Sequence, residues 1–260
     1  MDFGLDGDSA LVTAGSSGLG LASAKALARE GAHVAVCGTT PDHLAAAEAE
    51  LADLGEGDVL AMEADITDRE QVEGFVDATV AAFGGLDHVV TSAGGPPSGS
   101  FLDTDDEDWY AAYDLLVMSA VWTTRFAHPH LADGGGTIVN ITSVSVKEVI
   151  DGLVLSNAVR RAVVGLMKTQ SREFAPEVRV NAVLPGSHET ARISDLVEQG
   201  VERGEYDSYE AGLAEWGSGV PLGRIGDAHE LGEAVAYLSS DRSSYVNGVS
   251  LPVDGGSMRS

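Results

Sequence analysis

The chain contains a single cysteine, Cys37, among its 260 residues, which excludes an intramolecular disulfide framework and fits a reducing compartment. No apolar run reaches the roughly 18 residues that a membrane-spanning helix needs. The opening segment MDFGLDGDSALV is acidic and poor in apolar side chains, so it does not resemble a secretory signal. These absences predict a cytoplasmic protein.

Basic residues are also scarce. Lysine and arginine total 15 against 41 aspartates and glutamates, which gives a formal net charge of −26, and Lys25, Lys147 and Lys168 are the three lysines. Such a surface repels nucleic acid and anionic membranes, so neither is predicted as a partner. Self-repulsion on this scale destabilises the compact state unless salt screens it. We therefore expect a halophilic protein; a merely acidic mesophilic protein is the alternative.

Short β-branched segments alternate with longer helical patterns along the whole chain. Helical patterns over 21–31, 41–55 and 69–84 separate the early strands, which predicts parallel pairing through right-handed crossovers. The strands are almost wholly apolar, as expected when helices cover both faces of a sheet. We predict one domain, residues 1–260, with an α/β doubly wound Rossmann fold and a seven-stranded, mostly parallel sheet. The predicted strands are 9–14, 33–38, 58–65, 86–94, 137–143, 178–186 and 248–256.

The segment TAGSSGLG, residues 13–20, joins the first predicted strand to the first helix. Glycines allow a tight turn and let the backbone approach a diphosphate, and the helix start offers free N–H groups and partial positive charge. Ligands in doubly wound sheets bind beyond the carboxyl ends of the strands, where this segment lies. The pattern favours a dinucleotide site; a plain tight turn is the alternative.

This turn and five later segments resemble the short-chain dehydrogenase/reductase family over nearly the whole chain. Thr13, Gly18 and Gly20 fit the family's T-G-x-x-x-G-x-G, whereas Ala14 replaces the first glycine and Gly15 lies one step late. The segments ADIT, TSAGG, VRVNAVLPGSHET and the stretch from PLGRIG to VDGG follow in the family's order. The resemblance implies hydride transfer between a nicotinamide cofactor and a small carbonyl or alcohol substrate.

The resemblance also implies a set of cofactor-binding residues. Asp65 matches the family aspartate that binds the adenine, and Pro185, Gly186 and Thr190 fall beside the nicotinamide. No acid stands at 38–40 to repel a 2′-phosphate, which favours NADP over NAD, although Thr39 replaces the arginine of many NADP-preferring relatives. The full set is Thr13, Gly15, Ser17, Gly18, Leu19, Gly20, Thr39, Asp65, Ile66, Ala93, Gly94, Arg160, Pro185, Gly186 and Thr190.

Three of the four catalytic residues that the family implies are replaced. Ser143 matches the serine, but the tyrosine position holds Ser156, the lysine position Arg160 and the asparagine position Leu116. A serine hydroxyl is a far weaker acid than a phenol, whose pKa is about 10. An arginine can hold a ribose but cannot release a proton, because its pKa exceeds about 12.

The sequence therefore leaves the proton donor, and the function itself, open. Lys147 is our first substitute for the donor, so the predicted catalytic set is Ser143, Ser156, Arg160 and Lys147. Glu148, Asp151 and His188 are further candidates, and each of these groups also has an ordinary surface or turn interpretation. An oxidoreductase with a displaced proton donor is favoured, and a catalytically silent dinucleotide-binding sensor or scaffold is the alternative; no metal site is predicted.

Two further regions carry expectations that rest on the resemblance. Residues 192–216 form an acidic helical insertion, which in the family covers the substrate; an ordinary amphipathic helix pair is the alternative. The long helical patterns over 107–131 and 157–174 pair across subunits in the family. They predict a homotetramer or homodimer, with a monomeric core as the alternative.

Overall fold

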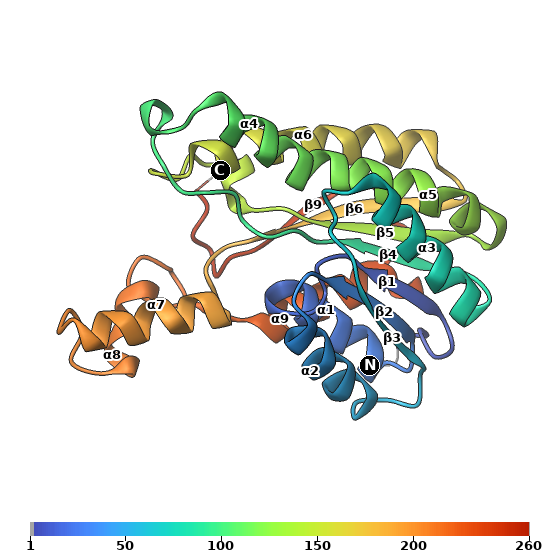
Figure 1. Cartoon of the computed structure of the whole chain (residues 1–260), viewed down its shortest axis with the longest axis horizontal. Helices are drawn as coiled ribbons and strands as arrows, with labels where there is room; N and C mark the ends of the chain where they lie inside the picture. Colours follow the sequence, from blue (N-terminus) through green and yellow to red (C-terminus); the bar gives the residue numbers. More distant parts are fainter. Residues whose placement is uncertain (1–2, 260) are drawn as a thin grey trace.

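A seven-stranded sheet forms the centre of the computed structural model, which describes residues 3–259 (Figure 1). The strand order is β3-β2-β1-β4-β5-β6-β9, and every neighbouring pair is parallel. The prediction of a doubly wound, seven-stranded α/β fold is confirmed. The strands are β1 (Ser9–Val12), β2 (His33–Gly38), β3 (Val59–Glu63), β4 (His88–Thr91), β5 (Gly136–Ile141), β6 (Val178–Pro185) and β9 (Ser250–Val253).

Helices cover both faces of the sheet (Figure 1). One layer consists of α1 (Gly18–Arg29), α2 (Pro41–Ala52) and α9 (Ala228–Ser239); the other contains α3 (Arg69–Phe83), α5 (Ser119–Gly134) and α6 (Val154–Glu173). Because helices cover both faces, the central strands are buried, and their apolar side chains suit that environment. All four residues of β1 and of β4 are buried. Two apolar clusters, one on each side of the sheet, form the core.

The long helical pattern expected over 107–131 is divided by a π-helical turn. It comprises α4 (Asp106–Tyr113), the π-turn η2 (Asp114–Met118) and α5. Asp105 starts α4 with a capping box that also involves Asp108. A π-turn inserts an extra residue into the helix and rotates the side chains that follow it, and such turns are frequent at functional sites.

Helices α7 (Ala191–Glu202) and α8 (Tyr209–Gly217) pack on each other and project from the body of the molecule (Figure 1). They coincide with the helical insertion expected over 192–216. Gly200 and Gly212 both lie against the Tyr206 ring, so a side chain at either position would collide with it. The pair is anchored at its base by the two-residue strands β7 (His188–Glu189) and β8 (Gly226–Asp227), a pairing that the sequence did not predict.

The remaining elements are short. Within the described residues, no helix combines the length and apolar character needed to cross a membrane. The three short 3-10 helices are η1 (Phe101–Asp103), η3 (Val144–Val146) and η4 (Asp241–Ser243).

Candidate active site: two adjoining cavities

Two cavities meet at the carboxyl ends of the central strands. The smaller, of about 350 Å³, lies over the glycine turn and the start of α1. The larger, of about 610 Å³, lies between the η3 loop, the start of α6 and the α7–α8 pair. Leu19, Gly95 and Thr190 line both, so a ligand in one reaches the other. We call them the turn cavity and the serine cavity.

The glycine turn is shaped by close backbone approaches. A side chain at Gly20 would place its Cβ 2.4 Å from the Ala14 carbonyl oxygen, so glycine is required there. Gly18 has a φ of 56° and Ala14 a φ of 45°, and Ala14 is the one non-glycine residue with positive φ in the described part of the chain. Ala14 therefore adopts the left-handed conformation, at a cost of about 1–2 kcal/mol.

The first turn of α1 faces the turn cavity without a side-chain cap. Ser17 stands at the cap position, but its hydroxyl accepts no hydrogen bond from the helix. Ser17, Gly18, Leu19 and Gly20 all line the cavity. The free amides and the helix dipole suit an anionic group at this point.

Two residues of the expected cofactor set instead hold the turn together. The Thr13 hydroxyl donates to the Ser92 carbonyl oxygen at 2.7 Å and accepts from the Ser92 amide at 2.8 Å. The Gly15 amide donates to the Cys37 carbonyl at 2.9 Å, and a Cβ at Gly15 would lie 2.8 Å from Val36 Cγ1. The Thr13 hydroxyl and the Gly15 amide are thus paired inside the protein, and neither residue lines the turn cavity, so their direct contact with a cofactor stays a prediction.

Three others lie outside the lining of both cavities. Thr39 is exposed after β2, and Ile66 is buried after β3. Asp65 accepts hydrogen bonds from the Thr67 amide at 2.8 Å and the Thr67 hydroxyl at 2.7 Å through one carboxylate oxygen, Oδ1. The shape of that loop is therefore fixed by Asp65 itself.

Ser156 and Arg160 lie one turn apart on α6, which places them on the same helix face. Ser156 lines the serine cavity and Arg160 the turn cavity. Arg160 is 9% exposed and donates to the carbonyl oxygens of Thr142 at 3.3 Å and Gly94 at 3.2 Å. Burial lowers the pKa of its guanidinium to about 10, so the side chain stays charged at neutral pH.

Three serines form a connected group beneath the serine cavity. Ser143 Oγ accepts from the Ser145 amide at 3.1 Å, and Ser145 Oγ lies 3.1 Å from Ser156 Oγ. Ser143 and Ser156 line the cavity, whereas Ser145 is fully buried. Sequence reasoning missed Ser145, although its position two residues after Ser143 in TSVS was the available signal.

Leu116, expected at the family's asparagine position, lies in the π-turn η2. It is buried and lines a small void together with Arg160, Thr91 and Ser119. The π-turn thus directs an apolar side chain toward the guanidinium. The Leu116 side chain has no polar atom, so it cannot form a hydrogen bond to a chain of water molecules.

The candidates for proton donor are separated by the fold. Lys147 is exposed and lies outside the lining of the serine cavity, so its position argues against the role expected for it. Its neighbour Glu148 lines the cavity instead. Asp151 is exposed and lies outside the lining as well. The backbone turns between these residues, and residue spacing alone did not show which side chain faces inward.

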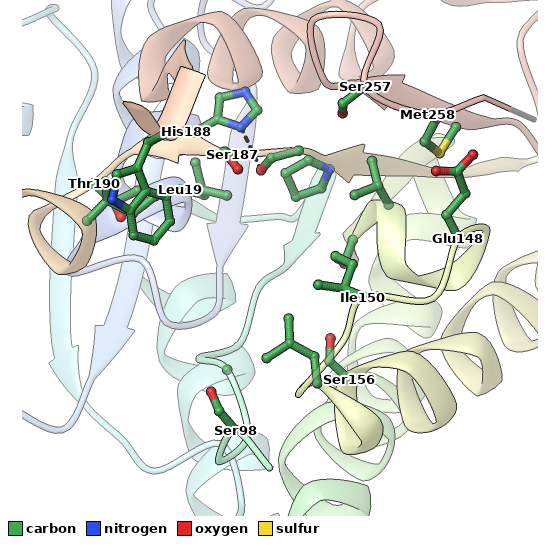
Figure 2. Close-up of a pocket in the computed structure, with 18 of the residues that line it drawn as sticks. Leu19, Ser98, Glu148, Ile150, Ser156, Ser187, His188, Thr190, Ser257 and Met258 are labelled. Carbon is green, nitrogen blue, oxygen red and sulfur yellow. Dashed lines mark hydrogen bonds between the residues drawn. The ribbon is translucent and has the colours of Figure 1, made fainter. Parts of the chain in front are cut away.

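His188 is buried, and its ring lies away from Ser156 (Figure 2). Nδ1 lies 3.2 Å from the Gly186 carbonyl oxygen, and the opposite edge of the ring packs on Gly226. Burial lowers the pKa of His188, so the ring is neutral at pH 7. Its Nδ1–H is therefore assigned to Gly186, where it stabilises the loop that follows β6.

The end of the chain closes the far side of the serine cavity (Figure 2). Asp254 accepts hydrogen bonds from the amides of Gly256 and Met258 at 3.0 and 2.8 Å, and the Arg259 amide donates to Glu148 at 2.5 Å. Ser257 and Met258 thereby join the lining. No sequence pattern indicated this contact, because it joins residues 111 positions apart.

Of the remaining expected residues, Ala93 and Gly94 line the turn cavity, and Pro185, Gly186 and Thr190 line the serine cavity. No cluster of three or more metal-ligating side chains occurs among residues 3–259. A doubly wound sheet with an open glycine turn at its switch point is the arrangement typical of a dinucleotide-binding oxidoreductase.

Comparison with known proteins assigns the family. A family model described as enoyl-(acyl carrier protein) reductase matches residues 13–258. The chain is 34% identical to the 2-keto-3-deoxy-L-fuconate dehydrogenase of Xanthomonas campestris over 259 residues, covering 97% of this chain and 80% of that protein. It is 32% identical to the 3-oxoacyl-(acyl-carrier-protein) reductase FabG of Thermotoga maritima over 254 residues, covering 97% and 98%.

Among solved structures, the L-sorbose reductase of Gluconobacter frateurii, in complex with NADPH and L-sorbose, superposes with a TM-score of 0.94. The two are 30% identical, and the match covers 100% of both chains. The chain belongs to the short-chain dehydrogenase/reductase family.

Proposed function

We propose that this protein is an NAD(P)-dependent oxidoreductase that transfers a hydride between a nicotinamide cofactor and a small carbonyl or alcohol. The observation that carries the proposal is the junction of the two cavities at Leu19, Gly95 and Thr190. A ligand that fills the turn cavity presents its far end to Ser143 and Ser156. The bound cofactor would supply or accept the hydride.

The residues of the turn cavity fit a dinucleotide. The uncapped amides at Ser17–Gly20 suit its diphosphate. Asp65 and Ile66, which lie outside the cavity lining, stay a prediction for the adenine that rests on the family resemblance. Arg160 carries a charge on a planar group with five N–H donors; two of its nitrogens donate to carbonyl oxygens, and further N–H groups would serve a ribose hydroxyl. We assign NADP rather than NAD, because Gly38, Thr39 and Thr40 carry no acid that would repel a 2′-phosphate.

The serine cavity is proposed to bind the reacting carbonyl or alcohol. Ser143 is half-buried at the cavity wall and orients the substrate oxygen. Ser156 and Arg160 stand at the family's tyrosine and lysine positions, so no phenol supplies the proton. A hydroxyl accepts one hydrogen bond while donating another, so Ser143 and Ser156 would each hold the substrate oxygen, and a water molecule admitted to the cavity would supply the proton.

The α7–α8 pair is proposed as the cover of the substrate, since Ile193, Leu196 and Trp216 line the serine cavity. Self-association through α4, α5 and α6 is proposed from exposed aromatic groups: Tyr110 is 71% exposed and Tyr113 47%. The charge of −26 and the single buried cysteine support a salt-adapted, cytoplasmic enzyme.

The test is nucleotide titration by calorimetry in concentrated KCl, followed by turnover of a panel of ketones and secondary alcohols. We expect binding of NADPH and turnover that Ser143→Ala reduces by about tenfold or more. Absence of binding for every nicotinamide nucleotide would refute the proposal.

A second function, a catalytically silent dinucleotide-binding sensor, is favoured by one observation. Among the residues described, the titratable side chains that line the serine cavity are Glu148 and His188; Glu148 pairs with the Arg259 amide and His188 with the Gly186 carbonyl, not with Ser143 or Ser156. Nucleotide binding without turnover of any substrate would support the sensor. Turnover that depends on Ser143 would eliminate it.

A further inference from the structure

The walls of the serine cavity are mostly apolar. They are formed by side chains such as Val144, Ile150, Leu153, Trp216 and Met258. Most of the polar side chains are serines, Ser98, Ser143, Ser156, Ser187 and Ser257, and they are spread around the cavity (Figure 2). A site with this lining binds a hydrocarbon body and fixes its orientation through a few polar groups.

The cavity contains one charged group among the side chains that the structure describes. His188, the other titratable residue of the lining, is buried, and burial lowers its pKa, which leaves the ring neutral. Lys147 and Arg259 flank the cavity but are exposed and lie outside its lining. Arg160 belongs to the turn cavity, where it donates to two backbone carbonyls. The remaining charge is the carboxylate of Glu148.

Glu148 is held in position rather than free in solvent. Its Oε1 accepts the Arg259 amide at 2.5 Å, which fixes the carboxylate at the rim formed by Met258 (Figure 2). Asp254 fastens the same end of the chain through the Met258 amide at 2.8 Å. A carboxylate fixed in this way, beside apolar walls, acts on an incoming charge more strongly than a mobile surface group does.

We infer that Glu148 selects the substrate by charge. The serine cavity takes ketones or secondary alcohols with a largely hydrocarbon body that is uncharged or bears an ammonium group, and it rejects those that bear a carboxylate or phosphate. An anionic substituent meets a like charge with no cation in the described lining to balance it, whereas an ammonium gains a partner. The inference rests on the proposed function and narrows its substrate class; the relatives named above include both uncharged and carboxylate substrates in their names.

The test uses three trans-4-substituted cyclohexanols that share one ring and differ in the 4-substituent: methyl, amino and carboxylate. We expect the carboxylate compound to show a kcat/KM, or a Kd in the presence of NADP⁺, at least about tenfold poorer than the methyl compound. Glu148→Gln should bring the methyl and carboxylate compounds to within about threefold and weaken the amino compound. Glu56→Gln removes the same charge from an exposed loop before β3, at the opposite edge of the sheet, and should leave the order unchanged.

A ligand-free measurement probes the same charge. Trp216 lines the cavity, so in a Trp109→Phe/Trp122→Phe background its fluorescence reports the local field. At constant ionic strength, Glu148→Gln should raise iodide quenching and lower caesium quenching by roughly 1.5- to 2-fold each. Equal quenching in both proteins overturns the inference.

The outcomes separate the two proposals. A wild-type protein that binds no nicotinamide nucleotide overturns the proposed function. A wild-type protein that binds nucleotide but accepts the carboxylate alcohol as well as the methyl alcohol overturns the charge selection alone. An unchanged preference in Glu148→Gln also overturns it, because the discrimination would then come from another group.

Discussion

The turn cavity and the serine cavity are adjacent, yet they relate to the sequence in different ways. The turn cavity is built from backbone geometry, in which Gly20 approaches Ala14 too closely for any side chain and α1 begins without a cap. The serine cavity is built from side chains contributed by η3, α6, α7 and the end of the chain. A binding site formed by closely approaching backbone segments tolerates few substitutions. A cavity lined by side chains can change its chemistry and keep its shape.

The largest effect is expected when the backbone geometry of the glycine turn is disrupted. Gly20→Ala places a Cβ 2.4 Å from the Ala14 carbonyl, so we expect a loss of about 3 kcal/mol in the free energy of unfolding and at least a 100-fold loss of nucleotide affinity. Chemical denaturation and calorimetry measure the two quantities.

The matched control is Gly74→Ala in α3, where an added Cβ meets nothing within 4 Å. It should stabilise the protein by about 1 kcal/mol and leave binding unchanged, because alanine favours the helix. Equal effects of the two substitutions would contradict the conclusion that position 20 requires glycine.

The second prediction converts the serine cavity to the family's usual chemistry. Ser156→Tyr together with Arg160→Lys supplies a phenol and a lysine at the expected positions, so kcat for carbonyl reduction should rise by about 100-fold. The measurement is steady-state NADPH oxidation with one ketone. Ser156→Phe with Arg160→Lys fills the same space without the hydroxyl and should show no gain. A gain of similar size in both variants would exclude proton donation as its cause.

The third prediction concerns the residue that links the cavities. Arg160→Met removes the donors to Thr142 and Gly94 and the charge facing the turn cavity, so the Kd for NADPH should increase about 10- to 50-fold. Calorimetry at fixed salt gives the value. Arg160→Lys retains the charge and should lose less affinity, and a lysine variant as weak as the methionine variant would speak against a role of the charge.

The smallest effect is expected at the strained alanine. Ala14→Gly relieves a positive φ of 45° but adds freedom to the unfolded chain, so the net gain in stability should be about 0.5–1 kcal/mol. Thermal denaturation measures it. Nucleotide affinity should stay within about threefold of the wild type, because the amides at the start of α1 are unaltered. Destabilisation by this substitution would show that the left-handed conformation carries no strain.

The predictions from the sequence agreed with the structure where a local residue pattern specifies the position of an element. Apolar runs and their helical spacers predicted all seven strands, and the family resemblance pointed to Ser143, Ser156 and Arg160, which line the joined cavities. The same reasoning did not distinguish Lys147, which is exposed, from Glu148, which lines the serine cavity. The direction of a side chain in an irregular loop depends on backbone dihedral angles, which the spacing of residues along the chain does not specify.

By itself, the sequence determined the doubly wound sheet, the glycine turn and the acidic surface. These depend on residue type and near neighbours along the chain, which the sequence states directly. Only the tertiary structure showed that the Gly15 amide and the Thr13 hydroxyl form hydrogen bonds inside the protein. The same holds for the contact between the Ser145 and Ser156 hydroxyls and for the hydrogen bond from the Arg259 amide to Glu148. Each of these contacts joins distant segments, and packing brings such segments together only after the sheet has formed.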